Sequence, residues 1–125
     1  SGGSQSGYLG EMLVVSVLGG KPDNTFDYDV VLDDGTKVDV KTKRTSSPPL
    51  PYYSCSVAKF NTSQKCDAYA FVRVKYDLSV GWFLGIIKKN DFFLKATEHN
   101  RGDYDPSNGF IFRADCYNLS IEELG

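Results

Sequence analysis

Three charged side chains on one short segment are the residues of this chain best suited to chemistry. The segment 29–43 reads DVVLDDGTKVDVKTK, with Asp29 at its start and Asp39 and Lys41 two residues apart near its end. Residues two apart on a β-strand project from the same face, so we expect Asp39 and Lys41 to stand side by side. Paired carboxylates are hard oxygen ligands for a divalent cation. The segment therefore predicts a metal site, provided that Asp29 joins this face.

The apolar residues of the segment indicate which positions of a β-hairpin face one another. A two-residue turn would place Val30 opposite Asp39 and mix apolar with charged residues on both faces. A three-residue loop that ends at Gly35 instead places Val30 opposite Val38. In that register Asp29 lies opposite Asp39, and Gly35 takes the left-handed position that such loops favour.

This register separates the hairpin into an apolar face and a charged face. The apolar face is expected to hold Tyr28, Val30, Leu32, Val38 and Val40. The charged face is expected to hold Asp27, Asp29, Lys37, Asp39 and Lys41, with Val31 as its one apolar member. A one-residue slip would exchange the two faces, so burial fixes the register. Like charges opposed across a ladder are destabilising, which favours a divalent metal ion between the two carboxylates. The alternative is a surface hairpin with an ordinary lysine–aspartate pair, worth at most ~1 kcal/mol.

The other elements follow from apolar periodicity and from the turn residues. Strands are expected over 26–32, 36–43, 52–57, 68–76, 81–88 and 110–119. Helices are expected over 8–18, 58–65 and 90–96, and after Ser120, which forms a capping box with Glu123. This order predicts an α/β fold in which a central mixed β-sheet is flanked by helices.

Length and composition bound the class of protein. The chain has 125 residues, of which 41% are apolar and 24% charged, as expected of one globular domain over residues 5–125. The opening Ser-Gly-Gly-Ser, residues 1–4, has the form of a cloning remnant. No apolar run approaches the roughly 20 residues that span a bilayer. Three widely spaced cysteines indicate reduced thiols in a cytoplasm. A net charge of −2 argues weakly against a nucleic-acid binder, unless several carboxylates serve as metal ligands.

Glu11 is a further candidate, in the expected helix 8–18. Nearly all of its neighbours in that helix are apolar. An ionised carboxylate in such surroundings is unfavourable unless it is paired or bound to a metal. The alternative is that Glu11 lies near the start of the helix, interacts with the helix dipole there and faces water.

A helix with a glutamate, then a hairpin with an aspartate and Asp-x-Lys, then a strand and a helix, resembles the PD-(D/E)XK nuclease superfamily. The matching residues are Glu11 in GEMLVV, Asp29 in YDVVL and Asp39-Val40-Lys41 in VDVKT. The resemblance covers about residues 8–75, and Tyr28 stands where the signature has a proline. It implies a restriction-endonuclease-like fold and hydrolysis of DNA phosphodiester bonds with Mg²⁺, for which Mn²⁺ would substitute.

The resemblance also implies a role for each matching residue. It makes Glu11, Asp29 and Asp39 metal ligands, with the Val40 carbonyl as a further one. Lys41 becomes the catalytic lysine, which orients the attacking water or stabilises charge in the transition state. Gln64 is expected near the metal, because members of the family often carry a glutamine or lysine on the corresponding helix.

Polar residues on both sides of the proline-rich loop 46–51 are candidate phosphate contacts, and a solvated loop and helix is the alternative. The candidates are Lys43, Arg44, Thr45, Lys59, Gln64 and Lys65. The expected function is a Mg²⁺-dependent DNA endonuclease, active as a homodimer because one site cuts one strand. We expect it in the cytoplasm of a bacterium or of a phage-infected host cell, with no membrane partner. An exonuclease or RNA-directed nuclease with the same site, or a catalytically silent nucleic-acid-binding module of the same fold, remains open.

Overall fold

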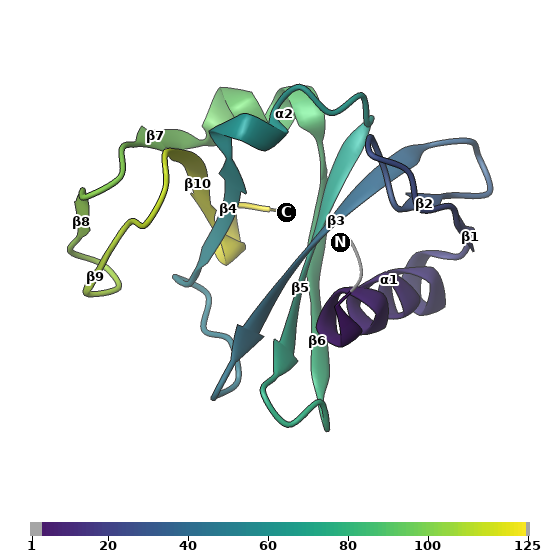
Figure 1. Cartoon of the computed structure of the whole chain (residues 1–125), viewed down its shortest axis with the longest axis horizontal. Helices are drawn as coiled ribbons and strands as arrows, with labels where there is room; N and C mark the ends of the chain where they lie inside the picture. The colour runs from purple at the N-terminus through teal and green to yellow at the C-terminus, as the bar shows by residue number, and fades with distance from the viewer. Residues whose placement is uncertain (1–3, 125) are drawn as a thin grey trace.

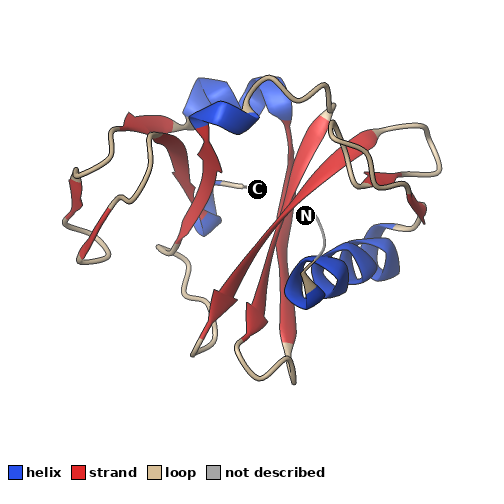
Figure 2. Cartoon of the chain, viewed as in Figure 1, coloured by secondary structure: helices blue, strands red, loops and turns tan. Residues whose placement is uncertain are grey.

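The structure is a computed structural model in which residues 4–124 are described (Figure 1). Strands make up most of the regular structure of these residues, with two α-helices and two short 3₁₀ turns (Figure 2). The elements in chain order are α1 (Gln5–Leu18), β1 (Lys21–Pro22), β2 (Val30–Val31), β3 (Lys37–Thr45), β4 (Ser54–Ala58), η1 (Lys59–Asn61), β5 (Ala68–Lys75), β6 (Gly81–Lys88), α2 (Lys89–Lys95), β7 (Thr97–His99), β8 (Tyr104–Asp105), β9 (Phe110–Ile111), β10 (Cys116–Ser120) and η2 (Ile121–Glu123).

The strands form a five-stranded sheet, a three-stranded sheet and a small hairpin. The large sheet has the order β1-β2-β3-β5-β6, and its β3–β5 pairing is parallel while the others are antiparallel. The smaller sheet has the order β4-β10-β7, and β8 pairs with β9. The prediction of an α/β fold with a mixed sheet is therefore confirmed. No helix within residues 4–124 is long and apolar enough to cross a membrane.

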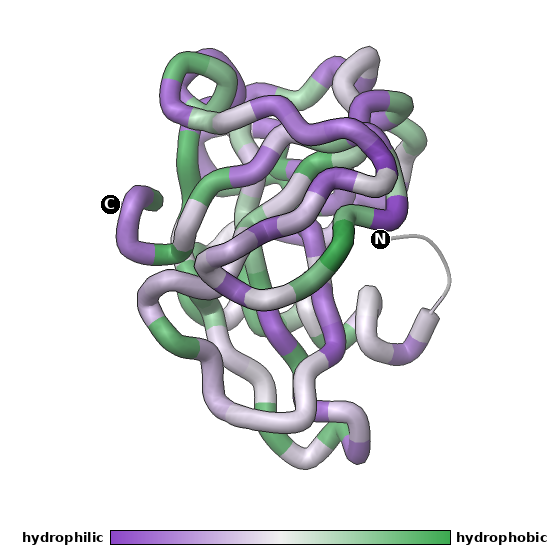
Figure 3. The backbone as a smooth tube through the Cα atoms, turned by 90° about the vertical axis from the view of Figure 1, so that its left-hand side faces the viewer, coloured by the Kyte–Doolittle hydropathy of each residue, from purple (hydrophilic) through white to green (hydrophobic). Residues whose placement is uncertain are grey.

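The large sheet is covered on both faces. Helix α1 packs on one face, where Val14 meets small and β-branched side chains of β2, β3 and β5. The smaller sheet and α2 cover the other face through a cluster that includes Tyr69, Phe71 and Phe92. Strand β5 is buried along nearly its whole length because it lies between these two layers. The backbone, viewed from the β8–β9 side, alternates between hydrophobic and hydrophilic stretches (Figure 3).

The predicted register of the hairpin is confirmed. Val30 pairs with Val38 and Val31 with Lys37, and Gly35 has φ +89° in the connecting loop. One expectation about its faces is wrong. Tyr28 leaves the apolar face and packs against the opposite cluster, where Lys37 Nζ lies 5.4 Å from its ring centre. The reason is that β2 is only two residues long, so the chain bends before it and the alternation does not extend back to Tyr28.

Several element boundaries also differ from the expected ones. The helix expected over 58–65 is a single 3₁₀ turn, η1. The strand expected over 110–119 is divided into β9 and β10 by the irregular segment 112–115. The capping box of Ser120 and Glu123 is present, and the helix that it starts is the 3₁₀ turn η2.

Helix α1 begins at Gln5, earlier than the expected residue 8, because Ser4 caps it. The Ser4 hydroxyl accepts a hydrogen bond of 3.0 Å from the Gly7 N–H. Ser4 therefore takes part in the fold, although it falls in the expected cloning remnant. Residues 1–3 of that remnant lie outside the described residues.

Gly10 allows α1 to approach β3 closely. A Cβ atom built at Gly10 would lie 2.0 Å from Thr42 Oγ1 and 3.2 Å from Thr42 Cβ. Thr42 projects from β3 toward the helix, so any larger residue at position 10 pushes the two elements apart. The same contact sets the position of the neighbouring Glu11 relative to the sheet.

We expect Gly10→Ala to destabilise the protein, because the clash with Thr42 costs about 1–3 kcal/mol and exceeds the ~1 kcal/mol gained from helix propensity. The melting temperature, followed by circular dichroism, should fall by about 3 °C or more. In a Thr42→Ala background the loss should shrink, since the closest atom is removed and its hydroxyl has no hydrogen bond within residues 4–124. Equal losses in both backgrounds would rule out this contact as the cause.

Candidate active site

Three acidic residues singled out from the sequence are buried near the edge of the large sheet. Asp29 lies directly before β2, Asp39 lies in β3, and Glu11 lies in the second turn of α1. Their exposed fractions are 3%, 1% and 4% respectively. Carboxylates are rarely this buried without a partner, which marks the region as a candidate site.

Asp29 occupies the place along β3 where the short strand β2 stops pairing. Its Oδ2 accepts a hydrogen bond of 2.8 Å from the Val40 N–H. If β2 were longer, this N–H would instead bond to the backbone of β2. The pKa of Asp29 is raised to about 7, chiefly by burial, although the Val40 N–H acts to lower it. A hydrogen bond with Asp39 and the negative charge of Asp39 contribute to the same rise. The carboxyl groups of Asp29 and Asp39 are therefore close enough to interact with each other.

Lys41 and Gln64 complete a chain of polar contacts around Asp39. Lys41 Nζ lies 2.7 Å from Asp39 Oδ2 and donates a hydrogen bond of 3.3 Å to Gln64 Oε1. Gln64 Nε2 donates in turn to the Phe26 carbonyl at 2.7 Å, which fixes the amide. The ammonium group approaches Asp39 Oδ2 outside hydrogen-bond geometry, so this buried oxygen accepts no hydrogen bond within residues 4–124.

Glu11 lies beside this pair without touching it as closely. Burial raises the pKa of Glu11, a hydrogen bond with the Asn24 side chain lowers it, and the charge of Asp39 raises it. Among the described residues, no three His, Cys, Asp or Glu side chains gather closely enough to hold one metal ion. The structure thus joins Asp29, Asp39 and Lys41, with Glu11 at electrostatic range.

The donor set of this region still fits a hard divalent cation. Two adjacent buried carboxylates supply oxygen ligands and a double negative charge, and one of these oxygens lacks a hydrogen-bond donor. The Val40 carbonyl belongs to the same short stretch of β3. Lys41 supplies only one positive charge to the three acids. The fit is to a cation held mainly by Asp29 and Asp39.

Three of the predicted phosphate contacts lie on or near β3 but differ in direction. Lys43 is exposed and lies on the same face as Lys41. Arg44 lies on the opposite face, where its Nε donates to Ser6 Oγ in α1 at 3.3 Å. Thr45 is buried, and its hydroxyl donates to the Ser47 carbonyl at 2.8 Å. Strand alternation explains the difference between Lys43 and Arg44.

The other two predicted lysines also lie away from the acidic pair. Lys59 forms an ion pair with Glu98 and lies 5.8 Å from the Tyr117 ring centre. Lys65 is exposed, and its backbone N–H donates to Asp27 Oδ1 at 3.0 Å. Neither lysine lines the large cleft between the two sheets.

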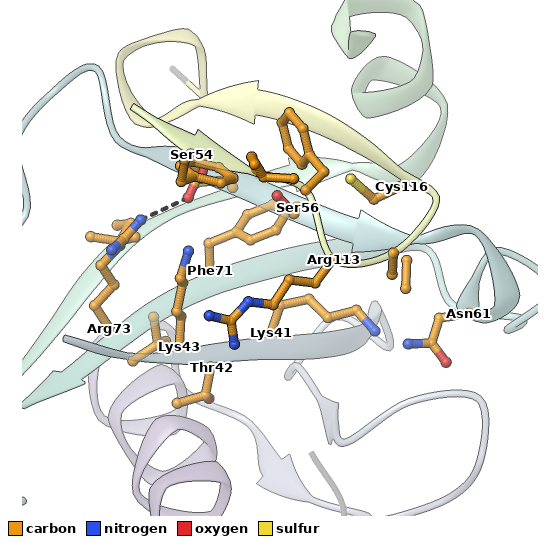
Figure 4. A pocket seen from close by; sticks show the side chains of 18 of the residues that line it. Lys41, Thr42, Lys43, Ser54, Ser56, Asn61, Phe71, Arg73, Arg113 and Cys116 are labelled. Carbon is orange, nitrogen blue, oxygen red and sulfur yellow. Dashed lines mark hydrogen bonds between the residues drawn. The ribbon is translucent and has the colours of Figure 1, made fainter. Parts of the chain in front are cut away.

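A cleft of about 1350 Å³ runs from Lys41 and Gln64 between the two sheets. Its walls come from β3 and β5 on one side and from β4, β9 and the start of β10 on the other (Figure 4). Lys43, Arg73 and Arg113 line it together with several aromatic residues. Arg73 and Arg113 were not predicted from the sequence. The sequence contains one indication of a special role for Arg73, because this residue interrupts the apolar run AYAFVRV. No feature of the sequence around Arg113 distinguishes it.

Comparison with known proteins assigns neither a family nor a function to the chain. No protein-family model matches the chain, and no curated protein matches it as a relative. Any function must therefore be argued from the residues described above.

The contact of Asp29 with Asp39 makes stability depend on pH. The pKa of Asp29 is about 7 in the folded protein, above the 3.8 of a free side chain. This group therefore favours folding below pH ~4, and that contribution is lost as the pH rises to 7. With EDTA present, Asp29→Asn, which keeps an acceptor for Val40, should melt about 3–8 °C higher than the wild type at pH 8.

This gain should shrink toward pH 4, where the Asp29 carboxyl group of the wild type carries a proton. Asp33→Asn, at an exposed loop aspartate, serves as the matched control and should leave the melting temperature unchanged. A lower melting temperature for Asp29→Asn at every pH would show that the ionised Asp29 carboxylate beside Asp39 does not destabilise the folded protein.

Proposed function

We propose that this protein is a metal-dependent nuclease that hydrolyses phosphodiester bonds of DNA. The observation that carries the proposal is the buried Asp29–Asp39 pair with the Lys41 ammonium 2.7 Å from Asp39, since Lys41 itself lines a cationic cleft. In phosphodiester hydrolysis, carboxylates can bind the metal ion, an ammonium group can stabilise negative charge on the phosphate, and a cleft can hold the nucleic acid. The ordered set Glu11, Asp29, Asp39-Val40-Lys41 supports the same class, through its resemblance to the PD-(D/E)XK nucleases.

In this proposal Asp29, Asp39 and the Val40 carbonyl hold Mg²⁺. Glu11 adds negative charge to the same region from α1. When bound, the cation would lower the pKa of a water molecule and neutralise phosphate charge. Asp29 would keep its hydrogen bond from the Val40 N–H, which orients its carboxylate.

The other residues of the site act on the substrate or on one another. Lys41 carries the positive charge that faces the phosphate, and it stabilises the charge that develops on the phosphate oxygens. Gln64 is a positioning residue: it accepts a hydrogen bond from Lys41 Nζ and is itself anchored on the Phe26 carbonyl. The cleft then receives the rest of the nucleic acid.

A catalytically silent nucleic-acid-binding module is the second candidate. It is favoured by one observation, that no three acidic, histidine or cysteine side chains within residues 4–124 gather around a common point. A module of this kind would use the cleft without the metal. Two experiments separate it from the enzyme.

The first experiment is calorimetric titration with Mg²⁺ and with Mn²⁺. We expect the wild-type protein to bind either ion, and Asp39→Ala to lose binding because the cation then has a single carboxylate left in contact. Asp33→Asn should bind like the wild type. If the wild type takes up no ion, the silent module is the better description.

The second experiment measures cleavage of supercoiled plasmid and of branched oligonucleotides, with and without Mg²⁺. Lys41→Ala should fold normally and lose at least ~100-fold in cleavage rate, because the charge beside the phosphate is removed. Lys37→Ala, an exposed lysine four residues earlier on β3, is the control and should retain activity. Full activity of Lys41→Ala would remove this residue from the mechanism.

Linear, circular and RNA substrates distinguish the kinds of nuclease. An endonuclease cuts circular DNA, an exonuclease needs an end, and an RNA-directed enzyme prefers the RNA strand. Cutting both strands of a duplex would call for two copies of the chain, as in a homodimer.

A further inference from the structure

The cleft has a marked imbalance of charge. Four cationic side chains line it, and none of its described lining residues is an aspartate or glutamate. The four are Lys41, Lys43, Arg73 and Arg113. Of these four, only Lys41 has a carboxylate of residues 4–124 at ion-pair distance, so the other three charges lack an acidic partner there. Figure 4 shows Lys41, Lys43 and Arg73 on the wall formed by β3 and β5, and Arg113 reaching across from the segment before β10.

Arg73 is the most unusual of these cations because it is buried. Only 6% of its surface is exposed, and its Nη2 donates to the Ser54 carbonyl at 2.9 Å. Its guanidinium carbon lies 5.0 Å from the Tyr53 ring centre, while its Nε has no hydrogen-bond partner in the described chain. A buried positive charge without a counter-charge is unfavourable. An anion in the cleft would supply the missing charge.

Lys43 lies next to Arg73 across the parallel strands. The two residues are register partners in β3 and β5. Lys43 keeps an exposed surface, but the cleft wall around it partly desolvates it and so lowers its pKa, and repulsion from Arg73 acts in the same direction. Lys43 Nζ also lies 5.6 Å from the Phe110 ring centre. Two like charges held together in this way form a site for a strongly anionic group such as a phosphodiester.

Exposed aromatic rings accompany the cations. Tyr76 and Tyr104 line the cleft with 63% and 62% of their surfaces exposed, and Phe110 is partly exposed. A cationic groove with aromatic rings is the pattern by which proteins bind unpaired strands, since bases stack on the rings while phosphates meet the cations. A duplex already stacks its bases, so it would leave these rings unused. The volume of about 1350 Å³ also exceeds the roughly 300–1,000 Å³ of small-molecule sites.

We infer that the cleft binds an unpaired nucleic-acid strand. Lys43, Arg73 and Arg113 hold its phosphates, and Tyr104 and Tyr76 stack on its bases. The strand passes Lys41, which also lines the cleft, so the substrate of the site is a single-stranded or splayed segment. The identity of the strand as DNA rests on the proposed function.

Binding is tested by fluorescence anisotropy in EDTA, with a fluorescein-labelled oligothymidylate of about 12 nucleotides, within the site sizes of single-strand binders. Lys43→Gln and Arg113→Gln should each weaken binding about 3- to 10-fold. Each should also reduce the slope of log K against log salt by about 0.7, as expected for one lost phosphate contact on a single strand. Tyr104→Ala should weaken binding about 5-fold or more without changing that slope.

Matched controls come from residues outside the cleft. Lys88→Gln and Tyr8→Ala remove an exposed lysine and an exposed tyrosine, and both should bind like the wild type. The melting curve of every variant is compared with that of the wild type. The substituted side chains are exposed, so folding is expected to be retained.

The inference is overturned if a duplex of matching length binds as tightly as the single strand, or if the cleft variants bind like the controls. Its failure is distinguishable from failure of the proposed function. Single-strand binding without Mg²⁺-dependent cleavage would sink the nuclease and leave the cleft assignment standing. Cleavage of duplex plasmid by a protein that does not bind the oligothymidylate would do the reverse.

Discussion

The hydrogen bond from the Val40 N–H to Asp29 is the interaction on which the candidate site depends. It holds a carboxylate against the edge of β3 where β2 has ended, and it brings Asp29 into contact with Asp39. Two buried acids side by side are electrostatically unfavourable, and a fold keeps such a pair only where the backbone over-determines it. Here the short β2 frees the Val40 N–H, and the well-packed register of Val30 with Val38 fixes the carboxylate in front of it.

The parallel pairing of β3 with β5 extends this local arrangement into a surface. Asp39, Lys41 and Lys43 follow one another on one face of β3, and Arg73 lies opposite Lys43 on β5. The charge along this row changes from negative to positive over a few residues. In the proposed nuclease, a phosphate backbone would be attracted along the cations toward Lys41, which contacts Asp39. The same register buries the valines of β3 against α1, which ties the row of charges to the core.

The sequence predicts the hairpin well because only one register separates its apolar from its charged residues, and because Gly35 suits the loop. It predicts Tyr28 wrongly, since alternation holds only while a strand continues and β2 is two residues long. Arg73 and Arg113 belong to the cleft through tertiary contacts between distant segments, and no local pattern contains that information. The direction of Arg44 follows from alternation alone. The position of Glu11 relative to the other acids depends on how α1 lies on the sheet, which the tight contact of Gly10 with Thr42 sets.

The two walls of the cleft come from parts of the chain that are synthesised at different times. Glu11, Asp29, Asp39 and Lys41 all belong to α1 and the first strands, whereas β4 completes its wall only by pairing with β10, near the end of the described residues. Pairings between distant segments form late, and N-terminal segments leave the ribosome first. The acidic pair can therefore assemble on a nascent chain before any groove for a polyanion exists. If the protein is the nuclease proposed above, such an order would keep the unfinished chain from acting on the nucleic acids that surround it during translation.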